Sequence, residues 1–314
     1  MKLNEFLGED GVIVPRKGHT GDVAVVGRPN VGKSTFINAV IGYHLTAVSH
    51  RPQTTRKHWR AIYTDEKAQI IFIDTPGIHE PKDKLGEAMF SNIVQQLKES
   101  DIILCIADAT REHGTEDELI CEKINEQPLS KKVILMVNKV DAAGREQVDD
   151  TISFFTERLG DKVADIIEVS ALKNKGLDSV IEKISSYLPV LPFMFDEDSI
   201  TDAYERDIAS ELIQEAVFEE YHKEVPHAIV VSVDNWKEDE KKIKIEATLY
   251  IERESHRKMI LGREGAKIKA LRSRAVSKLR ENIEKRVDLK IFVKVASDWR
   301  NKKSRLRDFG WELT

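Results

Sequence analysis

The sequence has few cysteines and no long apolar run. Cys105 and Cys121 are its two cysteines among 314 residues, and both lie in apolar contexts. This pattern does not suggest a disulfide framework. We expect both cysteines to be reduced core residues of a cytosolic protein. No apolar stretch approaches the length of a membrane span, and the N-terminus lacks the apolar region of a signal peptide. These absences predict a cytoplasmic protein.

The chain also lacks a net positive charge. Charged residues make up 33% of the sequence, hydrophobic residues make up 41%, and the formal net charge is −5 at pH 7. This composition is typical of a globular protein and argues against uniform affinity for nucleic acid, although it allows a local basic region. The length allows two or three domains and at least one sizeable core.

Residues Gly27–Ser34 form the most specific motif in the chain. They read Gly-Arg-Pro-Asn-Val-Gly-Lys-Ser, which fits the phosphate-binding P-loop pattern G-x-x-x-x-G-K-S. An apolar run at 23–26 precedes the motif, and apolar residues at helical spacing follow it over 34–41. Glycines at both ends let backbone N–H groups approach an anion, and the following helix directs its positive end to the same place. We expect Lys33 to contact the outer phosphates and Ser34 to bind Mg²⁺.

Two further motifs follow apolar runs that are typical of buried strands. Asp74–Gly77 reads D-x-x-G after the run 70–73, so its carboxylate can hold Mg²⁺ through water and Gly77 can offer an N–H to a γ-phosphate. Asn138–Asp141 reads N-K-x-D and follows the run 133–137. A carboxylate there can accept two hydrogen bonds from guanine, and adenine presents no such donor pair.

Additional strands are expected at 59–63, 102–107 and 166–169. The last of these runs ends in Ser170-Ala171-Leu172, where backbone N–H groups can meet the oxygen of guanine. Amphipathic stretches such as 119–125 and 148–159 separate the strands. This alternation, with motifs at the carboxyl ends of strands, predicts a doubly wound, mostly parallel α/β sheet.

Together with Gln53-Thr54-Thr55-Arg56, these segments make five motifs, and in this order they resemble the translation-factor-like branch of regulatory GTPases. The resemblance rests on residues 27–35, on Gln53-Thr54-Thr55-Arg56 and on 74–78. It implies that Thr55 reaches Mg²⁺ only with GTP bound, and that 45–58 and 77–92 are the two switches. The implied catalytic residues are Lys33, Thr55 and Gly77, and the implied Mg²⁺ ligands are Ser34, Thr55 and, through water, Asp74. The implied nucleotide-binding residues are Gly27, Arg28, Pro29, Asn30, Val31, Gly32, Lys33, Ser34, Thr35, Thr54, Thr55, Asp74, Thr75, Pro76, Gly77, Ile78, Asn138, Lys139, Val140, Asp141, Ser170, Ala171 and Leu172.

Ile78 departs from the Ras pattern, in which a glutamine at this position orients the attacking water. An isoleucine cannot form a hydrogen bond with water, so we expect slow intrinsic hydrolysis. In related GTPases, an asparagine at the position of Asn30 helps to hold a potassium ion. Stimulation of hydrolysis by K⁺ is therefore a hypothesis, and the alternative that Asn30 is only a turn residue stays open.

The chain after residue 200 shows a second pattern. We expect a helix capped by Thr201 or Asp202, an antiparallel pair of strands at 228–236 and 243–251, and two helices followed by a last strand at 287–295. Gly262-Arg263-Glu264-Gly265 joins those two helices. The order resembles a type 2 KH domain, whose GxxG loop clamps a nucleic-acid backbone. The implied RNA-binding residues are Gly262, Arg263, Glu264, Gly265, Lys267, Lys269 and Arg272.

The charge of this region agrees with RNA binding. Between Arg253 and Arg286 there are 12 basic and 4 acidic residues, although the whole chain is acidic. A local basic region is the electrostatic signature of a nucleic-acid site. A solvated helix face would explain part of this charge, and anionic lipid would suit it as well.

The two patterns together resemble the Era family of bacterial GTPases. This resemblance implies a monomeric, GTP-dependent switch that binds 16S rRNA near its 3′ end and assists assembly of the 30S ribosomal subunit. The alternatives are a membrane-associated signalling GTPase whose KH-like domain binds protein or lipid, with a peripheral pool at the inner membrane, and a GTP sensor that scarcely hydrolyses its ligand. The expected division is a mobile extension at 1–20, with at most a short strand at 12–14, a GTPase domain at 21–190, a linker at 191–200, a KH domain at 201–298 and a basic tail at 299–314.

Overall fold

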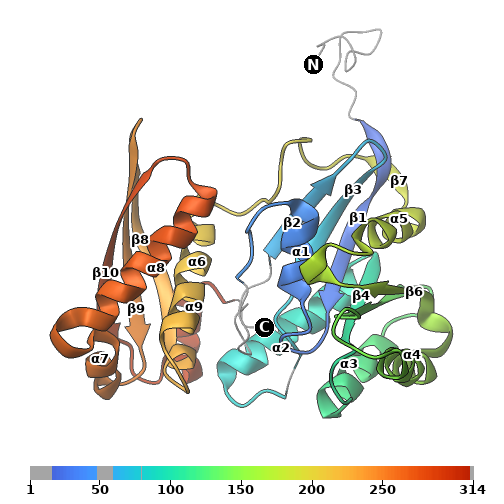
Figure 1. The fold of residues 1–314 in the computed structure, drawn as a ribbon, viewed down its shortest axis with the longest axis horizontal. Coiled ribbons are helices and arrows are strands. Elements are labelled where there is room, and N and C mark those ends of the chain that lie inside the picture. The colour runs from blue at the N-terminus through green and yellow to red at the C-terminus, as the bar shows by residue number, and fades with distance from the viewer. Residues whose placement is uncertain (1–15, 48–58, 79, 312–314) are drawn as a thin grey trace, which may run out of the picture.

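The computed structural model describes residues 16–47, 59–78 and 80–311, and two separate sheets divide them into two parts (Figure 1). The strand considered at 12–14, the switch residues Thr54 and Thr55, and most of the first expected switch lie outside the described residues.

The first part is built on a sheet with the order β2-β3-β1-β4-β5-β6, and β7 pairs with β1. β1 pairs in parallel with β3 and β4, and the parallel pairing continues through β5 to β6. β2 and β7 are antiparallel to their neighbours. Every residue of β3 and β4 is buried, as expected of apolar runs covered on both faces. The strands are β1 (Lys17–Val26), β2 (Trp59–Thr64), β3 (Ala68–Asp74), β4 (Ile102–Asp108), β5 (Lys132–Asn138), β6 (Val163–Val169) and β7 (Val190–Pro192).

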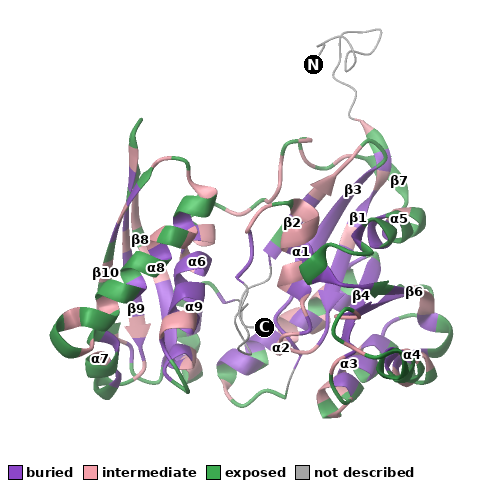
Figure 2. Ribbon diagram, viewed as in Figure 1, coloured by how far each residue is buried: buried purple, intermediate pink, exposed green. Residues whose placement is uncertain are grey.

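Helices cover both faces of this sheet, so the predicted doubly wound α/β fold is confirmed. α1 (Lys33–Ile41) and α5 (Leu177–Tyr187) supply apolar residues to the core on one face. α2 (Lys84–Glu99), α3 (Thr115–Asn125) and α4 (Arg145–Leu159) do so on the other. Figure 2 shows that the strands between these layers are mainly buried.

The second part has the element order expected of a type 2 KH domain. β9 pairs antiparallel with β8 and parallel with β10, and buried residues from the sheet, α6, α7 and α8 form one core. The elements are α6 (Glu205–Glu220), β8 (Ile229–Glu238), β9 (Lys242–Ile251), α7 (Glu254–Leu261), α8 (Ala266–Asn282) and β10 (Arg286–Val295). Short 3₁₀ turns complete the chain at η2 (Gly160–Lys162), η3 (Ala171–Lys173), η4 (Pro226–Ala228), η5 (Arg263–Gly265) and η6 (Trp299–Asn301).

Several segment boundaries differ from those expected. Residues 17–20, placed in the N-terminal extension, belong to β1, and β7 lies partly within the expected linker. This pairing joins segments far apart in the sequence and has no local signal. The N-cap of α6 is Tyr204, without a side-chain capping bond, rather than Thr201 or Asp202. Thr201 instead donates its hydroxyl hydrogen to the carbonyl of Arg60.

The C-terminal segment is folded through residue 311, in contrast to the expected tail. It forms η6 and α9 (Lys303–Asp308). Trp299 is fully buried and donates its indole N–H to Ala228 O at 3.1 Å. Leu85 and Met89 of α2 pack in the same apolar cluster. Apolar residues of this segment therefore connect the KH part to α2, which begins inside the expected second switch. The basic composition of the segment did not indicate this packing.

Candidate functional site

The loop between β1 and α1 lies at the carboxyl ends of the parallel strands. Gly77, three residues after the end of β3, lies against this loop: a Cβ atom there would be 2.6 Å from Pro29 N. The next residue donates its backbone N–H to Gly27 O at 3.3 Å, and Thr75 donates its hydroxyl to Val25 O at 2.7 Å. The D-x-x-G segment and the P-loop are therefore one packed unit, and a side chain at position 77 would separate them.

Lys33 is held inside the P-loop. Its side chain is buried, and Nζ donates hydrogen bonds to Gly27 O at 3.2 Å and Arg28 O at 3.0 Å. Burial lowers the pKa of Lys33 to about 8, although Asp74 and Glu116 oppose this shift. An anion in the loop would restore a stable positive charge, since a nearby opposite charge favours the ionised form.

Ser34 and Asp74 lie together beneath the loop. Ser34 Oγ donates to Asp74 Oδ2 at 3.0 Å, and Asp74 Oδ1 is buried without a hydrogen-bond partner among the described residues. Burial raises the pKa of Asp74 to about 6, against the effects of Lys33, Ser34 and the nearby hydroxyl of Thr46. An unpaired carboxylate oxygen beside a hydroxyl is a donor set that fits Mg²⁺, which prefers oxygen ligands and retains several waters.

Asn138, at the end of β5, links three loops. Its Nδ2 donates to Val31 O at 2.8 Å in the P-loop, and its Oδ1 accepts the N–H of Ala171 at 3.0 Å. The side chain is buried, so both hydrogen bonds are shielded from water. Asn138 thus fixes the expected base-binding loops against the phosphate loop.

Lys139 also forms a hydrogen bond with the P-loop. Its Nζ donates to Asn30 O at 2.8 Å and to Asp108 Oδ2 at 2.6 Å. Burial alone would raise the pKa of Asp108, but hydrogen bonds from Lys139 and Thr110 outweigh it and hold the pKa below its ordinary value. Asp108 was missed in the sequence, although a carboxylate at the end of β4, between two motif-bearing strands, was a usable signal.

Asp141 faces the remaining base-recognition loop. Lys173 Nζ lies 3.1 Å from Asp141 Oδ2, and hydrogen bonds from Ser170 and Lys173 hold the pKa of Asp141 below its ordinary value. The carboxylate therefore remains ionised and able to accept hydrogen bonds. Leu172, between these partners in sequence, is 81% exposed.

Two expected site residues direct their side chains elsewhere. Arg28 donates to Glu116 and Asp117 of α3 at 3.0 and 2.8 Å, so position 28 faces the loop only through its backbone. Ile78 is fully buried in the core beside α2. Of the other expected residues, Pro29, Asn30, Val31, Gly32, Thr35, Thr75, Pro76, Val140 and Ser170 lie in or beside these same loops.

The second candidate site is the loop between α7 and α8. Gly262 has a φ of 70°, and a Cβ atom there would lie 2.8 Å from Lys267 Cγ, so this position requires glycine. Arg263, Lys267 and Lys269 are exposed around the loop. Arg272, farther along α8, lies 3.5 Å from Asp288 of β10. The loop therefore presents backbone and cations to solvent, as an RNA clamp requires.

The two parts match two family models. Residues 22–139 match the model of 50S ribosome-binding GTPases, and residues 224–300 match the model of KH domains. GTPase Era of Clostridium perfringens is 38% identical over 294 residues, which cover 93% of this chain and 98% of that protein. GTPase Era of a Thermoanaerobacter species is 41% identical and covers 94% and 98% of the respective chains.

Solved structures give the same relationship across both parts. Era in complex with MgGDPNP and nucleotides 1506–1542 of 16S ribosomal RNA superposes with a TM-score of 0.88 at 36% identity, covering 94% of this chain and 100% of that chain. Aquifex aeolicus Era Y63A bound to GDP·AlF₄⁻ has a TM-score of 0.88 at 35% identity, with the same coverage. The chain thus belongs to the Era family of GTPases.

Proposed function

We propose that this protein is a GTP-binding switch that hydrolyses GTP slowly, binds small-subunit ribosomal RNA near its 3′ end and assists assembly of the 30S subunit. The observation that carries the proposal is the double hydrogen bond of Asn138, which ties an N-K-x-D loop to a P-loop in a chain that also presents a KH loop. A relative with the same two parts has been solved with MgGDPNP and 16S rRNA nucleotides.

The nucleotide would lie along the loops at the carboxyl ends of the strands. Lys33 and the P-loop amides would bind the phosphates, and Asp141 would accept hydrogen bonds from guanine. Ser34 and, through water, Asp74 would hold Mg²⁺, which neutralises charge on the phosphates when it is bound. Thr54 and Thr55 stay predictions from the sequence.

Slow hydrolysis follows from the position of Ile78. Its side chain packs in the core beside α2 and offers no hydrogen bond to an attacking water. Stimulation must then come from another group, and a K⁺ ion beside Asn30 is the candidate. Asn30 has a φ of 65°, a conformation that asparagine tolerates, and its backbone oxygen is bound to Lys139.

The KH part would sense the nucleotide through two contacts with the GTPase part. α2, at the second switch, packs on the C-terminal segment around Trp299. His44, immediately before the first switch, lies between α6 and α8. A change at either switch would therefore alter the orientation of the RNA-binding loop.

Lipid binding is the less favoured alternative. Among the described residues, no helix is both long and apolar enough to cross a bilayer. The basic loop lies in a fold whose established ligand class is single-stranded nucleic acid, so RNA is the favoured occupant. A peripheral membrane pool stays a prediction from the sequence alone.

The test combines RNA binding with single-turnover hydrolysis. The RNA is a single-stranded copy of the small-subunit 3′ end, and the variants are Gly262→Asp with Gly265→Asp, and Arg263→Ala with Lys267→Ala. We expect both double variants to lose most RNA affinity while retaining GTP binding. The second keeps both glycines and so separates loss of charge from distortion of the loop.

A matched control is Lys303→Ala with Arg307→Ala, which removes two exposed cations from α9. It should bind RNA almost as the unaltered protein does. Unchanged RNA affinity in both loop variants would overturn the KH assignment. A complete absence of phosphate release, with and without RNA and K⁺, would favour a GTP sensor instead.

A further inference from the structure

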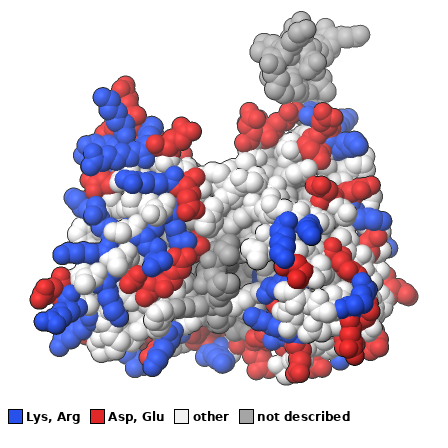
Figure 3. Space-filling view, viewed as in Figure 1, with Lys and Arg blue, Asp and Glu red and all other residues white. Residues whose placement is uncertain are grey.

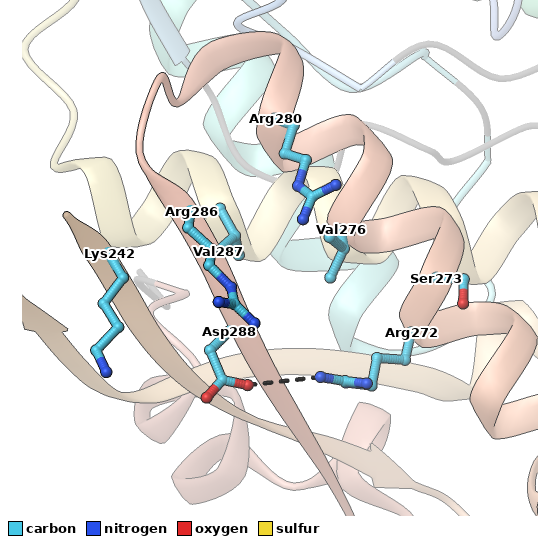
Figure 4. Close-up of a pocket in the computed structure, with 8 residues that line it drawn as sticks. All are labelled: Lys242, Arg272, Ser273, Val276, Arg280, Arg286, Val287 and Asp288. Carbon is cyan, nitrogen blue, oxygen red and sulfur yellow. Dashed lines mark hydrogen bonds and ion pairs between the residues drawn. The ribbon is translucent and has the colours of Figure 1, made fainter.

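Ion pairs are common on the surface of this protein, and many of them join residues outside the nucleotide-binding loops. Figure 3 shows acidic and basic side chains close together over both parts. Arg272 of α8 and Asp288 of β10, 3.5 Å apart, are one example (Figure 4). The pair of Lys173 and Asp141 is different, because Asp141 is the carboxylate proposed to bind guanine. Lys173 Nζ lies 3.1 Å from Asp141 Oδ2.

The loop that carries Lys173 is closed by its own backbone. Ser170 N donates to Lys175 O at 3.1 Å, and Lys175 N donates to Ser170 O at 3.0 Å. Between them, the backbone N–H of Lys173 also donates to Ser170 O at 3.1 Å. The side chain of Ser170 forms a hydrogen bond with Asp141. The backbone at Lys173 is therefore fixed beside Asp141, and its ammonium reaches the carboxylate from a fixed point.

The ammonium of Lys173 can leave this position more easily than the carboxylate can. The Lys173 side chain is 53% exposed, whereas that of Asp141 is 16% exposed. Among the residues that the structure describes, no other ion pair and no side-chain hydrogen bond engages this ammonium. A lysine carries its charge on a flexible four-carbon stem, so Lys173 can turn to solvent. The less exposed Asp141 is the group that requires a partner.

Lys173 is not required to keep Asp141 ionised. The pKa of Asp141 lies below its ordinary value, with the hydrogen bond from Ser170 as the first cause and that from Lys173 as the second. An aspartate with its ordinary pKa of about 3.9 is already ionised at neutral pH. The ion pair has a different consequence. Guanine offers two N–H groups to the two carboxylate oxygens, so the base competes with Lys173 for Oδ2.

We propose that Lys173 accelerates release of the nucleotide by replacing guanine on Asp141. When the base leaves, the carboxylate loses two hydrogen bonds in a place that is only partly exposed to water. The ammonium of Lys173 then pairs with it and stabilises the separated state. Within one binding site, differences of affinity appear mainly in the dissociation rate.

This inference rests on the proposed binding of guanine by Asp141 and adds a route for nucleotide exchange. Release of GDP returns a switch protein to the state that can bind GTP. A residue of the chain itself, Lys173, would therefore supply part of what an exchange partner supplies.

The test measures dissociation of fluorescently labelled GDP from the full chain in the presence of excess unlabelled GDP. We expect Lys173→Ala to slow release about two- to fivefold, the range of an ion pair between partly exposed groups. Lys173→Arg keeps the charge and should release GDP at nearly the unaltered rate. The matched control is Lys175→Ala, which removes an exposed lysine of the same loop and should leave the rate unchanged.

A second nucleotide tests whether Lys173 and the base compete for the same oxygen. Inosine diphosphate lacks the exocyclic amine of guanine, so one oxygen of Asp141 stays available to Lys173 in the complex. The ion pair then persists in the bound and the free protein. Lys173→Ala should leave the release of inosine diphosphate nearly unchanged. A variant that only loosened the loop would instead release both nucleotides faster.

Salt gives a further readout of the same ion pair. Salt screens charges that are exposed to solvent, with a Debye length of about 10 Å at 0.1 M and about 3 Å at 1 M. The ratio of the GDP release rates of the unaltered protein and Lys173→Ala should therefore approach one as salt rises over this range. A ratio that does not change with salt would contradict an electrostatic role.

The failures are distinguishable. If the unaltered protein binds no guanine nucleotide, the proposed function fails. If it binds GDP, but Lys173→Ala releases GDP at the unaltered rate or faster, the release role of Lys173 is overturned while the proposed function stands. Faster release would show that Lys173 contacts the bound nucleotide.

Discussion

His44 of the GTPase part lies with its Nε2 3.0 Å from Glu215 Oε2 of the KH part. Its Nδ1 lies 3.2 Å from Glu281 Oε2, and Asn282 donates to its backbone oxygen at 2.6 Å. Glu215 is shared with Lys278, whose Nζ is 2.9 Å from the other carboxylate oxygen. His44, immediately before the first switch, therefore connects the GTPase part to both α6 and α8 of the KH part.

This contact should make the domain arrangement sensitive to pH. The Glu215 carboxylate beside the imidazole raises the pKa of His44, against partial burial and the charge of Lys278. A raised pKa means that the contact is fully stabilising below the ordinary histidine value of about 6.5 and weakens as pH rises through the value in the folded protein. We expect a several-fold loss of the population in which His44 contacts α6 and α8 as pH rises over this range, measured by energy transfer between dyes on the two parts.

The control for this prediction is a second histidine. His113 stacks on Phe154 within the GTPase part, with ring centroids 4.4 Å apart. His44→Ala should abolish the pH dependence of the distance, whereas His113→Ala should preserve it. A distance that varies with pH identically in both variants would show that His44 is not the titrating group.

Lys33 should take up a proton when nucleotide binds. Burial holds its pKa at about 8, and phosphates would raise it again. GTP affinity should then fall as pH rises above 8, since the neutral amine must first be protonated. At pH 8 binding should take up about half a proton, and at pH 7 about a tenth from this group. Calorimetry in two buffers of different ionisation enthalpy measures the uptake; equal heats at pH 8 would contradict it.

Asp141 should determine the choice of base. Asp141→Asn replaces one acceptor with a donor, so it no longer matches the two N–H groups of guanine but does match the N–H and carbonyl of xanthine. We expect GTP affinity to fall about tenfold or more, as for loss of a hydrogen bond to a charged group, and affinity for xanthosine triphosphate to rise.

Lys173→Ala is the matched control for base selection. It removes the ion-pair partner of Asp141 but retains the carboxylate. Its preference for GTP over xanthosine triphosphate should persist, even if both affinities change. A reversal of preference in Lys173→Ala, or none in Asp141→Asn, would show that the carboxylate does not select the base.

The sequence predicted the parallel strands and their motif loops because each has a local signal. Continuous apolar runs such as 102–107 mark buried strands, and the motifs at their ends follow fixed spacings. The KH element order was likewise predictable. Apolar and polar residues alternate along its strands, and its helices carry apolar residues at helical spacing.

Features that depend on tertiary packing were not predictable. The pairing of β7 with β1 and the burial of Trp299 need partners distant in sequence. Composition alone could not divide the cations of α8 into a face neutralised by α6 and a face toward β10. Nor could it show that Arg28 turns to α3, because the acids that bind it lie almost ninety residues away.

Asn30 should support an effect of K⁺ on hydrolysis at the P-loop. If the side chain of Asn30 helps to hold K⁺, hydrolysis should be faster in potassium than in sodium at matched ionic strength, by about tenfold or more, or about 1.4 kcal/mol of barrier. Asn30→Gly removes the side chain but accommodates the φ of 65° without strain, so the loop should keep its shape and its hydrogen bond from Lys139. We expect this variant to bind GTP normally and to hydrolyse it equally slowly in both salts. Equal rates in potassium and sodium for the unaltered protein would exclude the ion, and a potassium effect that survives in Asn30→Gly would assign it to another residue.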